Sequence, residues 1–165
     1  MSTRMAALGS GLFLVLAPGT AAGIVPWLLT GWESEDPWLP LVVLGALLLA
    51  AGAAVVLHAF WRFVAEGIGT PAPVAAPQHL VVGGIYRHVR NPMYVAVLAM
   101  IIGQALLLGQ FVLLAYAALL WLVFASFVRF YEEPTLAARF GEDYDAYRRA
   151  VPAWLPRLRP WRPSG

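Results

Sequence analysis

A polar stretch, GGIYRHVRNPMY from Gly83 to Tyr94, stands between strongly apolar segments, and the rest of the chain is organised around it. It holds two arginines, a histidine, an asparagine and two tyrosines, and an apolar run follows directly. Pro92 suits the first position of a helix, where the N–H group that proline lacks has no partner. The residue before a proline is pushed out of the helical region, so Asn91 is expected to end a loop. The stretch therefore predicts a polar loop at the mouth of a membrane helix.

The composition indicates a membrane protein. Of the 165 residues 61% are hydrophobic and only 12% are charged, and the mean hydropathy is +0.72. A soluble single domain of this length is less apolar. Cysteine is absent, which excludes disulfides and thiolate sites. The three histidines share no ligand-like spacing, so we expect no metal site.

Four apolar runs predict an all-α fold, a polytopic membrane helix bundle that forms one domain over residues 1–165. About 20 helical residues cross a hydrocarbon core of roughly 30 Å. The expected spans are residues 5–29, 39–60, 93–108 and 111–130, with a cytoplasmic motif loop at 61–92 and cytoplasmic C-terminal helices and tail at 131–165. A cleaved signal peptide is an alternative for the first run, with Arg4 as its charged region.

The arginines predict the orientation in the membrane. The chain has no lysine, and with four spans all 11 arginines fall on one face. A Lys/Arg excess marks the cytoplasmic side. Both termini and the polar loop are therefore expected in the cytoplasm, with the spans in the plasma membrane if the protein is prokaryotic. The net charge of +2 then reflects orientation, and no nucleic-acid partner is expected.

A second polar cluster follows the last span and begins with Glu132 and Glu133. Two short helices are expected there, one ending at Phe140 and one over 143–151, with Gly141 between them. The hairpin of the third and fourth spans brings both clusters to one face, so Arg87 and Arg90 are expected to face the two glutamates. Such a charge set fits a structural ion-pair network or a ligand site, and the pattern itself favours the network.

The tail carries tryptophans and leucines among arginines. This composition, in Trp154, Leu155, Arg157, Leu158, Arg159, Trp161 and Arg162, is typical of a segment in the lipid headgroup layer.

Several motifs together resemble one enzyme family. Arg90-Asn91-Pro92-Met93-Tyr94 resembles the Arg-His-Pro-x-Tyr-x-Gly signature of the isoprenylcysteine carboxyl methyltransferase and phospholipid methyltransferase superfamily. The resemblance continues, in the family's order and over about residues 70–157, in Glu132-Glu133-x-x-Leu136, Phe140-Gly141-x-x-Tyr144-x-x-Tyr147 and Val151-Pro152-x-Trp154-Leu155-Pro156. Asn91 stands in place of the signature's histidine and Ala96 in place of its glycine.

The resemblance implies an integral-membrane methyltransferase that uses S-adenosylmethionine. Carboxylates would bind the ribose hydroxyls and the ammonium of this cofactor, arginine its carboxylate, and aromatic faces its sulfonium. The implied cofactor-binding residues are Tyr86, Arg87, His88, Asn91, Pro92, Tyr94, Glu132, Glu133, Tyr144 and Tyr147. Arg90 and Glu133 are the implied catalytic residues: Arg90 would hold an anionic nucleophile, and Glu133 would take the proton of an amine, a role also open to His88.

The resemblance further implies a lipophilic acceptor among membrane lipids, either a prenylcysteine-like carboxylate or a phospholipid-like amine. Two other interpretations stay open from the sequence. One is a membrane reductase of the sterol-reductase kind that binds NADPH, although Glu132 and Glu133 are unfavourable surroundings for a nucleotide phosphate. The other is a non-enzymatic scaffold in which the charged clusters are only structural.

Overall fold

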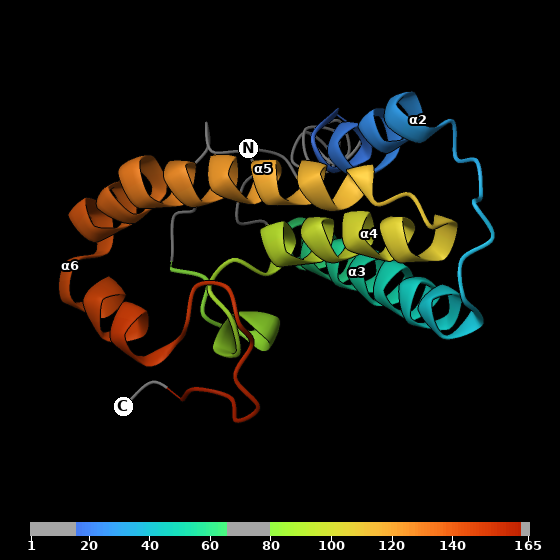
Figure 1. Ribbon diagram of the computed structural model, residues 1–165. Coiled ribbons are helices and arrows are strands. Elements are labelled where there is room, and N and C mark those ends of the chain that lie inside the picture. The colour runs from blue at the N-terminus through green and yellow to red at the C-terminus, as the bar shows by residue number, and fades with distance from the viewer. Residues whose placement is uncertain (1–15, 66–79, 163–165) are drawn as a thin grey trace.

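The computed structural model describes residues 16–65 and 80–162, and within these ranges it contains helices and connecting segments but no strand (Figure 1). The elements are a π-helical turn at Thr20–Ile24, α2 (Val25–Thr30), α3 (Leu39–Ala65), a 3-10 turn at Gly84–Arg87, α4 (Pro92–Leu108), α5 (Val112–Phe127), a second π-helical turn at Val128–Glu132, and α6 (Glu133–Ala150). The all-α prediction is confirmed. Two helical stretches, Leu39–Trp61 and the one that starts at Val112, are long and apolar enough to cross a membrane.

Helices α3 and α4 pack antiparallel with their backbones in close contact. A Cβ atom on Gly45 would lie 2.5 Å from the carbonyl oxygen of Gly103, and one on Gly52 would lie 2.7 Å from that of Ala96. The two contact pairs are each spaced by two helical turns, so one face of α3 meets one face of α4 along its length. Small residues permit such an approach between membrane helices, where close packing replaces the hydrophobic effect.

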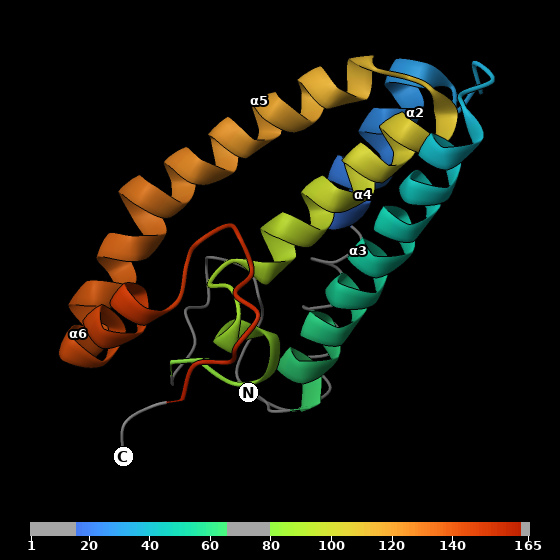
Figure 2. The same cartoon turned by 60° about the horizontal axis from the view of Figure 1, so that its bottom comes forward.

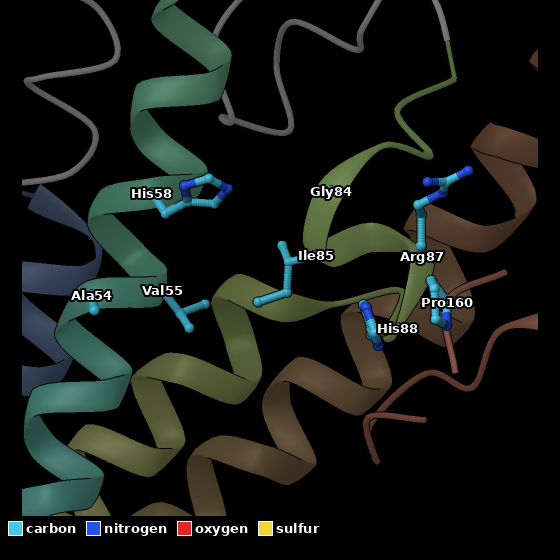
Figure 3. Close-up of a pocket in the computed structure, with 8 residues that line it drawn as sticks. All are labelled: Ala54, Val55, His58, Gly84, Ile85, Arg87, His88 and Pro160. Carbon is cyan, nitrogen blue, oxygen red and sulfur yellow. The ribbon is translucent and has the colours of Figure 1, made fainter. Parts of the chain in front are cut away.

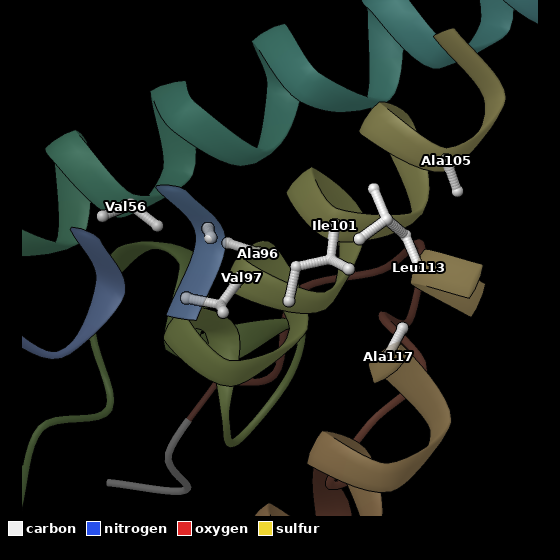
Figure 4. Packing of buried hydrophobic residues seen from close by; sticks show 8 residues of the cluster. Val56, Ala96, Val97, Ile101, Ala105, Leu113 and Ala117 are labelled. Atoms are coloured by element: carbon white, nitrogen blue, oxygen red, sulfur yellow. The ribbon is translucent and has the colours of Figure 1, made fainter. Parts of the chain in front are cut away.

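The first helix (Thr20–Thr30), α3, α4 and α5 enclose the apolar core. Ile101 of α4 and Leu113 of α5 are completely buried there, next to Val97 (Figure 4). The core also contains the side chain of Gln104, whose Nε2 donates to the carbonyl oxygen of Ala22 at 2.7 Å.

Pro26 explains the first π-helical turn. Pro26 has no N–H to offer the carbonyls four and five residues before it, and these are the carbonyls of Ala22 and Ala21. Gln104 donates to the first, and the Tyr116 hydroxyl donates to the second at 2.8 Å. Side chains from α4 and α5 therefore replace the missing backbone donor and tie the first helix to the bundle.

The α2–α3 connection and the α4–α5 turn lie at one end of the bundle. The backbone N–H of Glu35 donates to the carbonyl of Leu108 at 2.8 Å, and Gln110 Nε2 donates to the carbonyl of Glu33 at 3.1 Å. Figure 2 shows the motif loop and the C-terminal tail at the opposite end. The motif loop and the C-terminal tail therefore lie together at the end of the helices opposite the two connections.

The structure differs from the sequence-based expectation at two boundaries. Helix α3 continues to Ala65, five residues beyond the expected end at 60, and the expected loop residues 66–79 lie outside the described residues, as do 5–15 of the first span. The helix that begins at Val112 does not stop before Pro134 but runs on into α6. The π-helical turn just before Pro134 shifts the hydrogen-bond register where proline cannot donate, so the helix passes through.

Gly141 separates two helical pieces of α6, as the sequence predicts. Its backbone has φ 52° and ψ −126°, a conformation in which a side chain would be strained. The kink turns the second piece back toward the motif loop (Figure 2).

Candidate active site

The motif loop is held in place by the C-terminal tail. The backbone N–H of Arg90 donates to the carbonyl of Pro152 at 2.9 Å, that of Arg157 donates to the carbonyl of His88 at 2.9 Å, and that of Trp161 donates to the carbonyl of Arg87 at 3.0 Å. Two side chains add to this clamp: His88 Nδ1 donates to the carbonyl of Arg157 at 2.7 Å, and Asn91 Nδ2 donates to that of Ala153 at 3.2 Å. Loop and tail therefore form one hydrogen-bonded unit.

Arg90 stands at the centre of the site. Its Nη1 lies 2.7 Å from Glu133 Oε1, its Nε donates to the carbonyl of Val151 at 2.9 Å, and Nη1 also donates to the Tyr144 hydroxyl at 3.3 Å. The predicted pairing of Arg90 with a glutamate is confirmed. The guanidinium joins the motif loop, α6 and the start of the tail, a role that needs its several donors in one plane.

Glu133 is surrounded by three guanidinium groups. Besides Arg90, Arg129 Nη1 lies 3.5 Å and Arg148 Nη2 lies 3.4 Å from Glu133 Oε2. The Glu133 side chain is 9% exposed, whereas those of Arg129 and Arg148 are 65% and 40% exposed. The pair with Arg90 is therefore the energetically important one, because exposed pairs contribute little. Both oxygens of this carboxylate are therefore already occupied by partners within the protein.

Glu132 has a very different environment. The half-buried carboxylate accepts one hydrogen bond, from the Tyr94 hydroxyl at 3.3 Å, and it makes no ion pair with any residue that the structure describes. A carboxylate that is partly removed from water needs a cation or hydroxyl partner. Of the two glutamates, Glu132 is thus the one that remains available to a ligand.

The predicted tyrosines fall into two groups. Tyr144 and Tyr147 are buried, and the Tyr147 hydroxyl donates to the carbonyl of Tyr86 at 2.7 Å, so these two support the loop from below. Tyr94 and Tyr86 are only partly buried. The Tyr94 ring stacks on Phe124 with centroids 4.6 Å apart and lies 6.5 Å from the ring of Trp154. Tyr86 and Tyr94 are therefore the less buried pair of the four tyrosines.

The predicted contact of Arg87 with the glutamates is wrong. Arg87 makes no ion pair with either glutamate among the described residues; together with His88 it lines an open pocket of about 680 Å³ that also borders α3 (Figure 3). Its other lining residues are Ala54, Val55, His58, Gly84, Ile85 and Pro160. The volume is in the range of small-molecule sites.

His58 and the tail carbonyls are site elements that the sequence did not reveal. His58 lies near the end of the apolar run at 39–60, and no sequence motif links it to Gly84 and Ile85 of the motif loop, with which it shares a pocket. Asn91 and Pro92 are buried: Asn91 fixes the tail, and Pro92 begins α4. They position the loop.

Fold and site together define a membrane helix bundle with a polar, partly buried site at one end. The sequence pattern of the phospholipid methyltransferases matches residues 40–143, well over half of the chain, and the protein therefore belongs to this family. The chain is also 40% identical over 80 residues to the protein-S-isoprenylcysteine O-methyltransferase of Schizosaccharomyces pombe. That similarity covers 48% of this chain and only 34% of the relative's length.

Proposed function

We propose that the protein is an integral-membrane methyltransferase that transfers the methyl group of S-adenosylmethionine to a lipophilic acceptor. The observation that carries the proposal is the meeting of the motif loop with the Glu132–Glu133 pair, which puts the Glu132 carboxylate, without an ion pair among the described residues, beside the Tyr94 ring. The family match and the similarity to an O-methyltransferase support the reaction class.

The residues present fit this cofactor. S-Adenosylmethionine carries a sulfonium, an ammonium, a carboxylate and two ribose hydroxyls, and when bound it supplies an electrophilic methyl group. Glu132 would accept hydrogen bonds from the hydroxyls or the ammonium. The faces of Tyr86 and Tyr94 would stabilise the sulfonium. Arg87 and His88, on the pocket side of the loop, offer donors for a carboxylate. Arg90, Glu133, Asn91, Pro92, Tyr144 and Tyr147 would hold these groups in position.

The acceptor would enter from the bilayer, between α4 and α5. Figure 2 shows the two helices diverging from the Gly109–Gln110 turn toward the motif loop. In this direction Trp154 lies between them, 6.5 Å from the Tyr94 ring and 6.1 Å from the Trp121 ring. An apolar tail can follow these aromatic faces, with the reacting head beside Tyr94 and Glu132.

Alignment of the reactants would provide most of the catalysis. Methyl transfer from a sulfonium is an in-line displacement, and holding two reactants in line contributes about 7–11 kcal/mol. A carboxylate or thiolate nucleophile needs no base. An amine must lose a proton, and Glu132 is better placed to accept it than Glu133, whose oxygens already meet three arginines.

The test is methyl transfer from labelled cofactor by the purified protein in lipid. Membrane lipid extracts and prenylcysteine analogues are expected to accept label, and Glu132→Gln to abolish most of it. Small soluble thiols and amines serve as comparison acceptors, and calorimetry with NADPH in place of the cofactor tests the reductase alternative. Turnover of the soluble acceptors alone, or binding of NADPH but not of S-adenosylmethionine, would reject the proposal.

The site is proposed to face the cytoplasm, where S-adenosylmethionine is made. The expected arginine asymmetry places both termini on that side. Reporter fusions at Ser34 or Gln110 should read as external, and a fusion at Gly165 as internal. An external C-terminus would contradict the orientation and the access of the cofactor together.

A further inference from the structure

The C-terminal tail exposes two leucine side chains almost completely. The side chain of Leu155 is 80% exposed and that of Leu158 is 97% exposed, although both follow the buried Val151 closely in sequence. Arg159 and Arg162 are exposed nearby, with no ion pair or hydrogen bond to the described part of the chain. No Asp or Glu occurs after Asp145, so the surface formed by residues 155–162 is apolar and purely basic.

This surface lies at the depth where the apolar helices end. Pro160 lines the same pocket as Ala54, Val55 and His58, which belong to the last turns of the apolar stretch Leu39–Trp61. On the other side, the Trp154 ring contacts that of Trp121 within the apolar part of α5. A segment held between these levels is in the layer of the lipid headgroups.

The same segment is hydrogen-bonded to the motif loop. The backbone N–H groups of Arg157 and Trp161 donate to the carbonyls of His88 and Arg87, and His88 Nδ1 donates to the carbonyl of Arg157. Whatever fixes residues 155–162 therefore also fixes the loop that carries Tyr86 and Arg90.

We propose that residues 155–162 dock on anionic lipid headgroups and that this docking orders the motif loop. Leu155 and Leu158 insert at the boundary of the acyl chains, and Arg159 and Arg162 bind the lipid phosphates. A basic residue near an anionic surface strengthens binding by about five-fold, so two arginines contribute about 25-fold. Lipid charge thereby controls the order of the site. The docking does not depend on the proposed function. Only the effect of docking on methyl transfer rests on that function.

The basic charge favours lipid over the other partners of an apolar patch. In a symmetric contact between two copies of this chain the same purely basic surface would come from both sides, which is repulsive. A protein partner would need an acidic surface at headgroup depth, whereas an anionic bilayer is present there along the whole segment.

The absence of cysteine permits a direct test of depth. A nitroxide on Leu158→Cys is compared with one on Asp143→Cys, an exposed position of α6, in nanodiscs with no anionic lipid and with about a third phosphatidylglycerol. The Leu158 label is expected to become accessible to a lipid-soluble relaxant and protected from a water-soluble one only in the anionic discs. The Asp143 label should stay in water in both. A Leu158 label that is unaffected by lipid charge, or one whose protection depends on protein concentration, would overturn the proposal.

Hydrogen exchange tests the coupling to the loop. The amides of Arg90 and Arg157 are expected to exchange at least about five-fold more slowly in anionic than in zwitterionic discs, and the double variant Arg159→Gln/Arg162→Gln should lose this difference. Arg149→Gln, an exposed arginine of α6, is the matched control and should keep it. If the double variant retains the difference, the tail does not transmit lipid charge to the loop. If exchange responds as expected but no acceptor is methylated, the docking stands and the proposed function fails.

Discussion

Glu133→Gln is expected to lower the free energy of unfolding by about 3 kcal/mol, because it leaves the Arg90 guanidinium largely buried without a counter-charge. Both side chains are buried, at 12% and 9% exposure, and their nitrogen and oxygen atoms lie 2.7 Å apart. A loss of this size lowers the melting temperature by roughly 6–12 °C for a chain of this length. Thermal unfolding in detergent, without cofactor, measures it.

The other members of the network provide the controls. Arg129→Ala and Arg148→Ala remove exposed partners of the same carboxylate and are expected to cost less than about 1 kcal/mol each. Glu142→Gln makes the same chemical change as Glu133→Gln at an exposed position of α6 and should leave the melting temperature unchanged. A Glu133→Gln protein that melts like the wild type but no longer binds cofactor would make Glu133 a ligand-binding residue and refute the structural role.

The meeting of Arg90 with a glutamate was predictable because it follows from topology. Two antiparallel helices joined by a short turn bring residues 43 positions apart to the same end. The apolar runs likewise predict the helices, since their length and composition leave few other structures in a membrane.

The distinct environments of the two glutamates were not predictable from the sequence. Glu132 and Glu133 are adjacent, so on a helix their side chains diverge by about 100°. Which of them meets Arg90 depends on the rotation of the helix, and the π-helical turn at Val128–Glu132 shifts that rotation. The surroundings of Arg87 were not predictable for a similar reason. The 3-10 turn at Gly84–Arg87 is too short to carry an apolar pattern that would show which neighbour each side chain faces. The hydrogen bonds between the tail and the motif loop use backbone carbonyls, which every residue has, so the sequence does not indicate them.

Gln104 illustrates a signal that can be read only with a structure. A lone glutamine in an apolar run is costly in a membrane and indicates a partner, but the sequence does not name it. The partner is the carbonyl of Ala22, which Pro26 leaves without a donor on another helix. Pro26 and Gln104 therefore act together, although they lie 78 residues apart and nothing in the sequence connects them.

Glu132→Gln is expected to weaken the binding of S-adenosylmethionine by about 10- to 150-fold, the value of one charge-assisted hydrogen bond of about 1.5–3 kcal/mol. The wild-type carboxylate makes no ion pair within the described residues, and its one hydrogen bond, from Tyr94, can also be donated to an amide oxygen. The variant is therefore expected to keep its free energy of unfolding within about 1 kcal/mol of the wild type. Calorimetric titration with the cofactor, next to thermal unfolding without it, separates the two quantities.

Tyr94→Phe shows whether Glu132 acts directly. It removes the donor that orients the carboxylate but leaves the charge and the ring stacked on Phe124, so it should weaken binding by less than about ten-fold. Glu142→Gln is again the matched change without a ligand, and it should bind normally. If Glu132→Gln instead binds cofactor like the wild type, the Glu132 carboxylate is not part of the cofactor site, and the pocket lined by Arg87 and His88 becomes the candidate for it. If it melts as early as Glu133→Gln, the two glutamates form one structural network. The expected pattern is a loss of cofactor affinity in Glu132→Gln and a loss of stability in Glu133→Gln. Because the two residues have the same side chain, this difference would come from their surroundings alone.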